Sequence, residues 1–156
     1  MIQLGHILHP TDFSEPAKQA MAYALELAER FDSELHALYV LPPMGAIPWS
    51  AGGYVPPSMV EAEEQHRVEA AGMLKSLIPS NEGGNPTIHH DVRDGTPFIR
   101  IIEHAREAEI DLIVMGTHGH SGLKHMLLGS VAEKVVRKAP CPVLTVRPEG
   151  HQFVMP

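Results

Sequence analysis

Two short segments of this 156-residue chain carry residue types and spacings that could hold an anionic ligand. In the longer one, Gly116 and Gly119 follow an apolar run, and Gly129 and Ser130 open an expected helix. Glycine tolerates positive φ and lets backbone approach a ligand closely, while the free N–H groups at the start of a helix attract anions. Together with the Ser130 hydroxyl, these features predict a phosphate cradle built mainly from backbone.

The shorter segment is Pro10-Thr11-Asp12, which follows the first expected strand. Asp12 either orients a ligand or bonds the backbone at the start of the next helix. Its place at a strand end favours the ligand role, since ligands of open α/β sheets bind beyond the carboxyl ends of the strands. Its negative charge is unsuited to direct phosphate contact, so we expect Asp12 near the uncharged part of the ligand.

Known phosphate motifs do not cover the glycine segment. It lacks the Gly-Lys-Ser/Thr ending of a Walker A loop, and it is not a G-x-G-x-x-G sequence. On pattern alone a second interpretation stays open, in which Gly116 and Gly119 only form a turn and Ser130 only caps a helix.

The chain contains eleven histidines, which raises the question whether some of them bind a metal ion. His118, His120 and His125 lie close together, but the chain has a single distant cysteine and no histidine pair at helical zinc-site spacing. His89 and His90 should point to opposite faces of a strand. We therefore expect no metal site made by protein side chains, and leave open whether His118 or His120 contacts phosphate.

No residue set indicates catalysis. His9, Asp12 and Ser14 are near one another in sequence, but this says little about the geometry of a catalytic triad. Cys141 lies between two prolines beside an apolar run, which is typical of a buried structural thiol.

The elements that must position these residues alternate along the chain. Apolar runs predict strands at Leu4–His9, Leu35–Leu41, Thr87–Val92, Asp111–Met115 and Pro142–Val146. Four helices are expected from their start signals, which are an N-cap at Ser14, a capping box at Ser58–Glu61, Thr96-Pro97 and Ser130. The helix that starts at Ser58 should run to about Leu77, and the helix that starts at Ser130 should run to Lys138. This alternation predicts an α/β fold, a doubly wound and mostly parallel sheet with helices on both faces.

Residues 42–57 interrupt the alternation with five prolines and three glycines. Such a segment cannot be a helix or a central strand, and long loops of this kind are lids, binding segments or disordered. Trp49 and Tyr54 in this loop could cover a ligand or present a partner surface, and a loop with no such task remains the alternative.

Composition and net charge limit the classes of partner that this protein is expected to bind. Twelve basic against nineteen acidic residues give a net charge of −7, without a Lys/Arg run, which argues against a broad nucleic-acid interface. We expect no membrane insertion, because no apolar stretch approaches the roughly 20 residues needed to span a bilayer. One cysteine and no recognisable signal peptide predict a cytoplasmic protein.

The spacing G-x2-G-x9-G-S from Gly116 to Ser130 resembles the ATP-binding signature of the universal stress protein family. The surrounding string from Asp111 to Pro148 and the opening H-I-L-H-P-T-D-F-S-E are similar to that family as well. The resemblance implies one domain over residues 1–148 with a C-terminal tail at 149–156.

This resemblance also implies a five-stranded, Rossmann-like sheet and a homodimer paired through the last strand, residues 142–146. It implies ATP as the ligand, with Mg²⁺ or Mn²⁺ bound through the phosphates. The adenosine would lie at Pro10, Thr11, Asp12 and Val40, the ribose near Met115 and Gly116, and the triphosphate along Gly119, Gly129, Ser130 and Val131, with His118 inside the motif.

The sequence thus favours a nucleotide-dependent regulatory or stress-response protein with an unknown protein partner. Two alternatives stay open: a nucleotide-independent, chaperone-like interaction protein, and a slow ATPase. The absence of a Walker lysine, an evident general base or a water-positioning residue counts against the enzyme.

Overall fold

The computed structural model describes residues 3–43, 57–78, 86–118 and 128–147, and every helix and strand named below lies in these segments. The strands are β1 (His6–Thr11), β2 (Glu34–Leu41), β3 (Ile88–Asp94), β4 (Leu112–Gly116) and β5 (Val143–Val146). The helices are α1 (Glu15–Phe31), α2 (Pro57–Leu77), α3 (Pro97–Glu107) and α4 (Ser130–Lys138). The expected five-stranded α/β fold is therefore confirmed.

All strands are parallel and follow the order β3–β2–β1–β4–β5. The chain first builds outward from β1 to β2 and β3, and then crosses back to place β4 on the other side of β1. The order of strands thus changes direction between β1 and β4, which is where open α/β sheets bind ligands.

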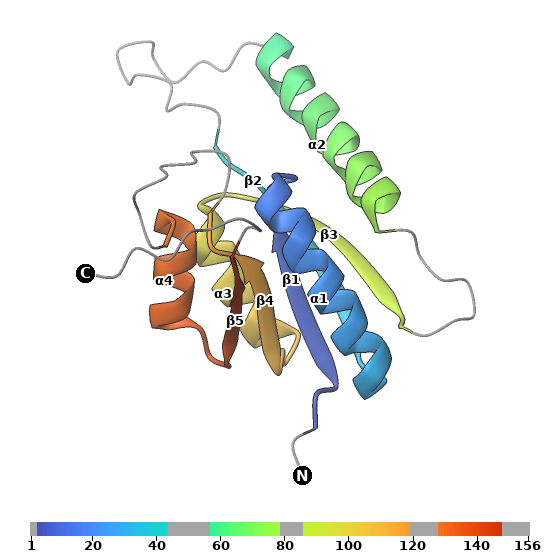
Figure 1. Cartoon of the computed structure of the whole chain (residues 1–156). Coiled ribbons are helices and arrows are strands. Elements are labelled where there is room, and N and C mark those ends of the chain that lie inside the picture. Colours follow the sequence, from blue (N-terminus) through green and yellow to red (C-terminus); the bar gives the residue numbers. More distant parts are fainter. Residues whose placement is uncertain (1–2, 44–56, 79–85, 119–127, 148–156) are drawn as a thin grey trace.

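Helices cover both faces of the sheet (Figure 1), and an aliphatic core lies between the helices and each face. One core joins Ile7, Leu35 and Val114 of the strands to alanines of α1 and to Leu74 of α2. The other joins Leu8, Leu38 and Ile113 to Ile101 of α3 and Val135 of α4. Residues of β1 alternate between the two cores because successive side chains of a strand point to opposite faces.

Small residues let α1 lie close to the sheet. Ala17, Ala20, Ala24 and Ala28 of α1 are all buried, as their helical spacing predicts. Ser14 caps this helix as expected, with its hydroxyl accepting a hydrogen bond from the Ala17 N–H at 3.4 Å.

β1 and β4 part at their carboxyl ends. β1 pairs with β2 as far as Thr11, but its pairing with β4 ends at Leu8. Pro10 has no N–H with which to extend a ladder. The His9 ring instead donates from Nδ1 to the Val114 carbonyl oxygen at 2.9 Å, because a carbonyl can only accept. This separation leaves room for a cavity between the two strand ends.

Some predicted bounds were wrong. β1 begins and ends two residues later than the predicted Leu4–His9, so Pro10 and Thr11 are strand residues, tolerated because β4 no longer pairs beside them. β3 runs to Asp94 because it pairs with β2 to that strand's end at Leu41. α2 begins at Pro57, so Ser58 lies inside its first turn and is not the predicted N-cap.

The other strand and helix bounds agree with the prediction to within one residue, and α4 matches it at both ends. Residues 44–56 of the predicted loop and residues 148–156 at the C-terminus lie outside the described residues. Within the described segments, no helix has the length and apolar character required to cross a membrane.

Candidate functional site

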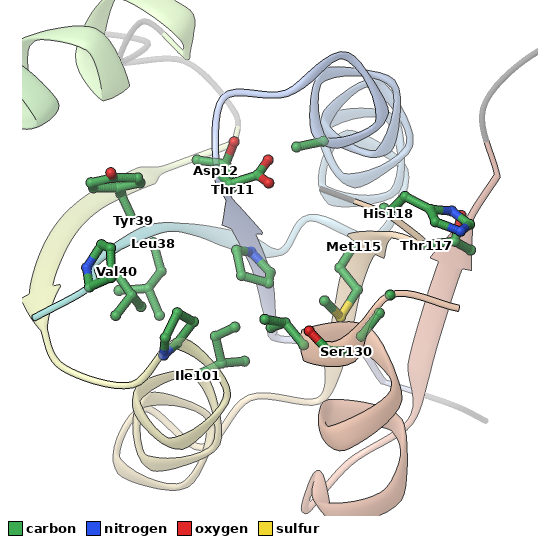
Figure 2. Close-up of a pocket in the computed structure, with 18 residues that line it drawn as sticks. Thr11, Asp12, Leu38, Tyr39, Val40, Ile101, Met115, Thr117, His118 and Ser130 are labelled. Carbon is green, nitrogen blue, oxygen red and sulfur yellow. The ribbon is translucent and has the colours of Figure 1, made fainter. Parts of the chain in front are cut away.

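A cavity of about 410 Å³ lies at the carboxyl edge of the sheet, where β1 and β4 part. We call it the strand-end cavity. Figure 2 shows Thr11 and Asp12 at the end of β1, with Tyr39 and Val40 on one side and Met115 and Ser130 on the other. Its volume falls in the range of about 300–1,000 Å³ that is typical of small-molecule sites.

The fold gathers the predicted site residues around this one cavity. Ten of the eleven predicted positions line it, and Gly119 lies outside the described residues. The ten are Pro10, Thr11, Asp12, Val40, Met115, Gly116, His118, Gly129, Ser130 and Val131. They come from three strand ends and the start of α4, so distant segments of the sequence meet here.

The turn after β1 holds Asp12 in place. Phe13 has a φ of 64°, which is uncommon for a residue with a Cβ. The Thr11 hydroxyl accepts a hydrogen bond from the Phe13 N–H at 3.0 Å, and Asp12 Oδ1 accepts one from the Ser14 N–H at 3.0 Å. Asp12 therefore bonds the backbone at the start of α1, one of the two roles considered for it, and it also lines the cavity.

The start of α4 forms a second wall. Its first helical hydrogen bond runs from Glu133 N–H to the Gly129 carbonyl. The N–H groups of Ser130, Val131 and Ala132 precede this bond and therefore have no acceptor within the helix. All three residues line the cavity, and the positive end of the helix dipole faces it with them.

Backbone contacts also fix the base of the glycine segment. The Gly129 N–H donates to the Thr117 carbonyl at 2.7 Å, and the Thr117 N–H donates to the Val146 carbonyl at 3.0 Å. A Cβ on Gly129 would lie 3.1 Å from the Thr117 oxygen, so a side chain would crowd this junction. The two ends of the segment, residues 117–118 and 128–129, are thereby held together beside the cavity.

Gly116 packs against the backbone of another element. Its φ is not positive, since Gly95 is the only glycine with positive φ among the described residues. A Cβ at Gly116 would lie 2.9 Å from the Pro16 carbonyl oxygen and 3.2 Å from the Ala17 nitrogen. The backbone that approaches Gly116 closely is thus the start of α1, which could not pack against β4 if residue 116 had a side chain.

One half of the cavity is apolar. Leu38 and Val40 of β2, Ile101 of α3 and Met115 of β4 line it, together with Pro42 and Pro97. Of these residues, the sequence predicts only Val40 and Met115 as part of the site. α3 follows β3 directly, so Pro97 at its start was a signal that could have placed this helix at the same edge of the sheet.

The described lining contains one carboxylate, Asp12, and neither lysine nor arginine. Burial, and secondarily the charge of Asp12, raises the pKa of Tyr39, which also lines the cavity. An anion in this cavity would therefore meet backbone N–H groups rather than cationic side chains, and it would be repelled least at the α4 side.

His118 lies at the β4 side of the cavity, as Figure 2 shows. Its Nδ1 is 2.9 Å from the hydroxyl oxygen of the buried Thr117. His120 and His125, the other histidines of the motif, lie outside the described residues.

Comparison with known proteins gives a consistent result. A sequence model described as the Universal stress protein family matches residues 4–147. Universal stress protein MJ0531 of Methanocaldococcus jannaschii is 38% identical over 141 residues, covering 90% of this chain and 81% of that protein.

Solved structures of similar sequence share the fold. The structure of hypothetical protein MJ0577 has a TM-score of 0.81 at 28% identity, covering 96% of this chain and 99% of that one. A universal stress protein solved in complex with cAMP has a TM-score of 0.59 at 25% identity, covering 94% and 98%.

Proposed function

Because this chain belongs to the universal stress protein family, we propose that it binds an adenine nucleotide, ATP in particular, in the strand-end cavity. We propose further that nucleotide occupancy regulates its association with a protein partner in a stress response. The relative solved with cAMP supports an adenine nucleotide as the class of ligand.

The observation that carries this proposal is the pairing of an apolar half with a helix N-terminus in one cavity. Leu38, Val40 and Ile101 offer a surface for a purine ring, and the N–H groups at the start of α4 offer donors for phosphate. Asp12 lies between them at the end of β1, where a ribose hydroxyl could donate to its carboxylate.

The residues present therefore fit ATP without a Walker lysine. When bound, Mg²⁺ or Mn²⁺ would neutralise phosphate charge that the protein leaves uncompensated, since the described lining has no lysine or arginine. A dedicated cage of protein side chains is not needed to hold this ion, because Mg²⁺ in nucleotide sites keeps several waters and binds the substrate phosphates.

Two substitutions at one position test the phosphate site. Ser130→Ala removes the hydroxyl, whereas Ser130→Pro removes both the hydroxyl and the N–H. Proline suits the first position of a helix, and Gly129 already has the extended conformation (φ −69°, ψ 157°) that precedes proline. The helix should thus remain intact in both variants.

For ATP we expect a small loss of affinity with Ser130→Ala and a further loss of roughly tenfold to hundredfold with Ser130→Pro. This further loss corresponds to the free energy that a hydrogen bond to a charged group usually contributes. Adenosine, measured in the same titration calorimetry, should bind both variants alike. Equal ATP affinity for the wild type and both variants would refute the placement of the phosphates at α4.

A second experiment asks whether nucleotide binding is the function at all. Freshly purified protein is denatured, and the supernatant is analysed for adenine nucleotides by chromatography. Released nucleotide in near-stoichiometric amount supports the proposal. Its absence, together with no ATP binding in dialysis, would favour the nucleotide-independent interaction protein instead.

Hydrolysis is tested separately, because binding does not require it. Phosphate release from ATP and Mg²⁺ should be negligible. A rate that falls in parallel with affinity in Ser130→Pro would instead identify a slow ATPase.

We also propose a homodimer paired through β5. This strand lies at the edge of the sheet, so one side of its backbone has no neighbouring strand within the described residues. Leu144 is exposed on it, as is Val136 of the adjacent α4. Replacing Leu144 with lysine should shift the mass measured by light scattering from dimer to monomer, and a wild-type protein that is monomeric would refute the proposal.

A further inference from the structure

Four histidines converge at the amino-terminal edge of the sheet, opposite the strand-end cavity. His6 begins β1, His36 lies in β2, His89 lies in β3 and His104 belongs to α3. Glu34, the first residue of β2, pairs in register with His6, and His36 pairs with His89. We call these four residues and Glu34 the histidine cluster.

The cluster is separate from the nucleotide site proposed above. His36 and Val40 both belong to β2, and four residues of strand separate them by about 13 Å at 3.3 Å per residue. No member of the cluster lines the strand-end cavity.

Three side chains of the cluster present metal-ligand atoms to one point. His6 Nδ1 lies 3.4 Å from His36 Nε2 and 4.0 Å from Glu34 Oε2. One ligand atom from each of the three lies within 4.8 Å of the others. Two nitrogens bound to one tetrahedral Zn²⁺ at about 2.0–2.1 Å lie about 3.3–3.4 Å apart, so the two rings already have the separation of zinc ligands.

Surrounding residues orient these ligands. His36 Nδ1 lies 3.2 Å from His104 Nε2, and the rings are nearly perpendicular, with centroids 5.3 Å apart. A proton on His36 Nδ1 donated to His104 leaves the lone pair of His36 Nε2 directed at His6. Glu34 is held by His89, whose Nε2 lies 2.7 Å from its Oε2. Partners of this kind fix the ring orientation of metal ligands.

Charged residues lie next to His104, on the side away from the proposed ligands. The buried His104 has its Nδ1 3.3 Å from Asp91 Oδ2 without a hydrogen bond between them. Arg93 pairs with Asp91 at 2.8 Å and with Glu107 at 2.7 Å, so the arginine charge is already balanced by two carboxylates.

The alternative is that His6 and His36 simply share a hydrogen bond. That interpretation accounts for one pair of rings, but not for the His89 ring on the same carboxylate or for the contact of His36 with His104.

We propose that His6, Glu34 and His36 bind a divalent transition-metal ion of the zinc class. Two imidazoles and one carboxylate make a donor set that Zn²⁺ accepts, with a fourth position left for water. His6 and Glu34 have 39% and 47% of their side chains exposed, so an ion can enter from solution. This site would overturn the expectation from sequence that no side chains of this chain hold a metal.

The test uses untagged, chelator-treated protein titrated with Zn²⁺ alone, and reads affinity and stoichiometry by competition with a chromophoric chelator. We expect one Zn²⁺ per chain, with affinity at least tenfold weaker in His6→Gln and Glu34→Gln. His66→Gln, at an exposed histidine of α2, is the matched control and should bind Zn²⁺ as the wild type does. His104→Gln, a change in a positioning residue, should weaken affinity tenfold to a hundredfold.

Two further readouts distinguish ligation from a structural effect. Zn²⁺ should raise the melting temperature of the wild type but not of His6→Gln, because an ion that binds only the folded state stabilises it. Co²⁺ in place of Zn²⁺ should give the visible absorption of a tetrahedral site, and His6→Gln should lose it. Failure of the wild type to bind Zn²⁺, or equal binding by His6→Gln, Glu34→Gln and the control, would overturn the proposal.

Discussion

The buried His9 ring should make the stability of this protein depend on pH. His9 is completely buried beneath α1, and burial lowers its pKa from 6.5 to about 4, against smaller opposing effects of its bond to Val114 and of the Asp12 charge. Its Nε2 is also buried and has no hydrogen-bond partner among the described residues. Protonating this nitrogen would place a charge in an apolar interior.

The direction in which stability changes with pH follows from proton binding to His9. In the unfolded chain His9 takes up a proton near its ordinary pKa of 6.5, whereas the folded protein resists protonation down to about pH 4. The stabilisation is therefore fully present above pH 6.5 and is lost as the pH falls through this interval. At 1.36 kcal/mol per pKa unit, the loss amounts to about 3 kcal/mol at pH 4.

His9→Asn isolates this contribution, because an asparagine amide can still donate to the Val114 carbonyl but does not titrate. Urea unfolding of both proteins is measured from about pH 7.5 to about pH 4, an interval that brackets the pKa values of His9 in the unfolded and the folded protein. The wild type should lose about 3 kcal/mol more than the variant over this range. His36 and His104, whose pKa values are also lowered, contribute equally to both proteins and cancel.

Parallel stability curves for the two proteins would refute the reasoning. Such a result would mean that the folded protein accepts the proton on His9, through water or a local rearrangement. An NMR titration of the His9 ring gives an independent check, since its resonances should remain those of the neutral ring down to about pH 5 if its pKa is lowered as described.

Three other substitutions, one of them with a matched control, probe the cavity and the core beside it. Gly116→Ala places a Cβ 2.9 Å from a backbone oxygen of α1 and should lower the free energy of unfolding, measured with urea, by about 1–3 kcal/mol. The control is Gly72→Ala, whose Cβ would have nothing within 4 Å and which should raise the free energy of unfolding by up to about 1 kcal/mol. Leu8→Ala empties a fully buried position and should cost roughly 2–5 kcal/mol in the same assay, and a smaller loss would mean that the core collapses around it. Asp12→Asn removes the charge that helps to raise the pKa of Tyr39, so the ultraviolet titration of Tyr39 should move toward its ordinary value, and an unchanged titration would show that burial alone is responsible.

Local patterns were enough to predict most of the fold. The order of strands and helices, the Ser14 cap and both bounds of α4 depend on residues close together in sequence, and the structure confirms them. Errors occurred where a distant partner decides the outcome. β1 includes Pro10 because pairing with β2 continues there while pairing with β4 has ended, and no local pattern reports which neighbour a strand loses.

The role of Gly116 illustrates the same limit. Its place after an apolar strand predicts a close approach to a ligand, and no local pattern shows that another part of the chain packs against this glycine. The partner is the backbone of Pro16 and Ala17, a hundred residues earlier in the chain.

What the sequence determined by itself is the alternation of elements and the chemistry available at their ends, because hydrophobic periodicity and helix-start signals are local. The tertiary structure alone decided which ends meet. Placing β1 between β2 and β4 brings Val40, Asp12 and Ser130 around one cavity, and pairing β1, β2 and β3 under α3 brings His6, His36 and His104 together at the opposite edge. These histidines are far apart in sequence, so only the register of the strands and the packing of α3 could reveal their cluster.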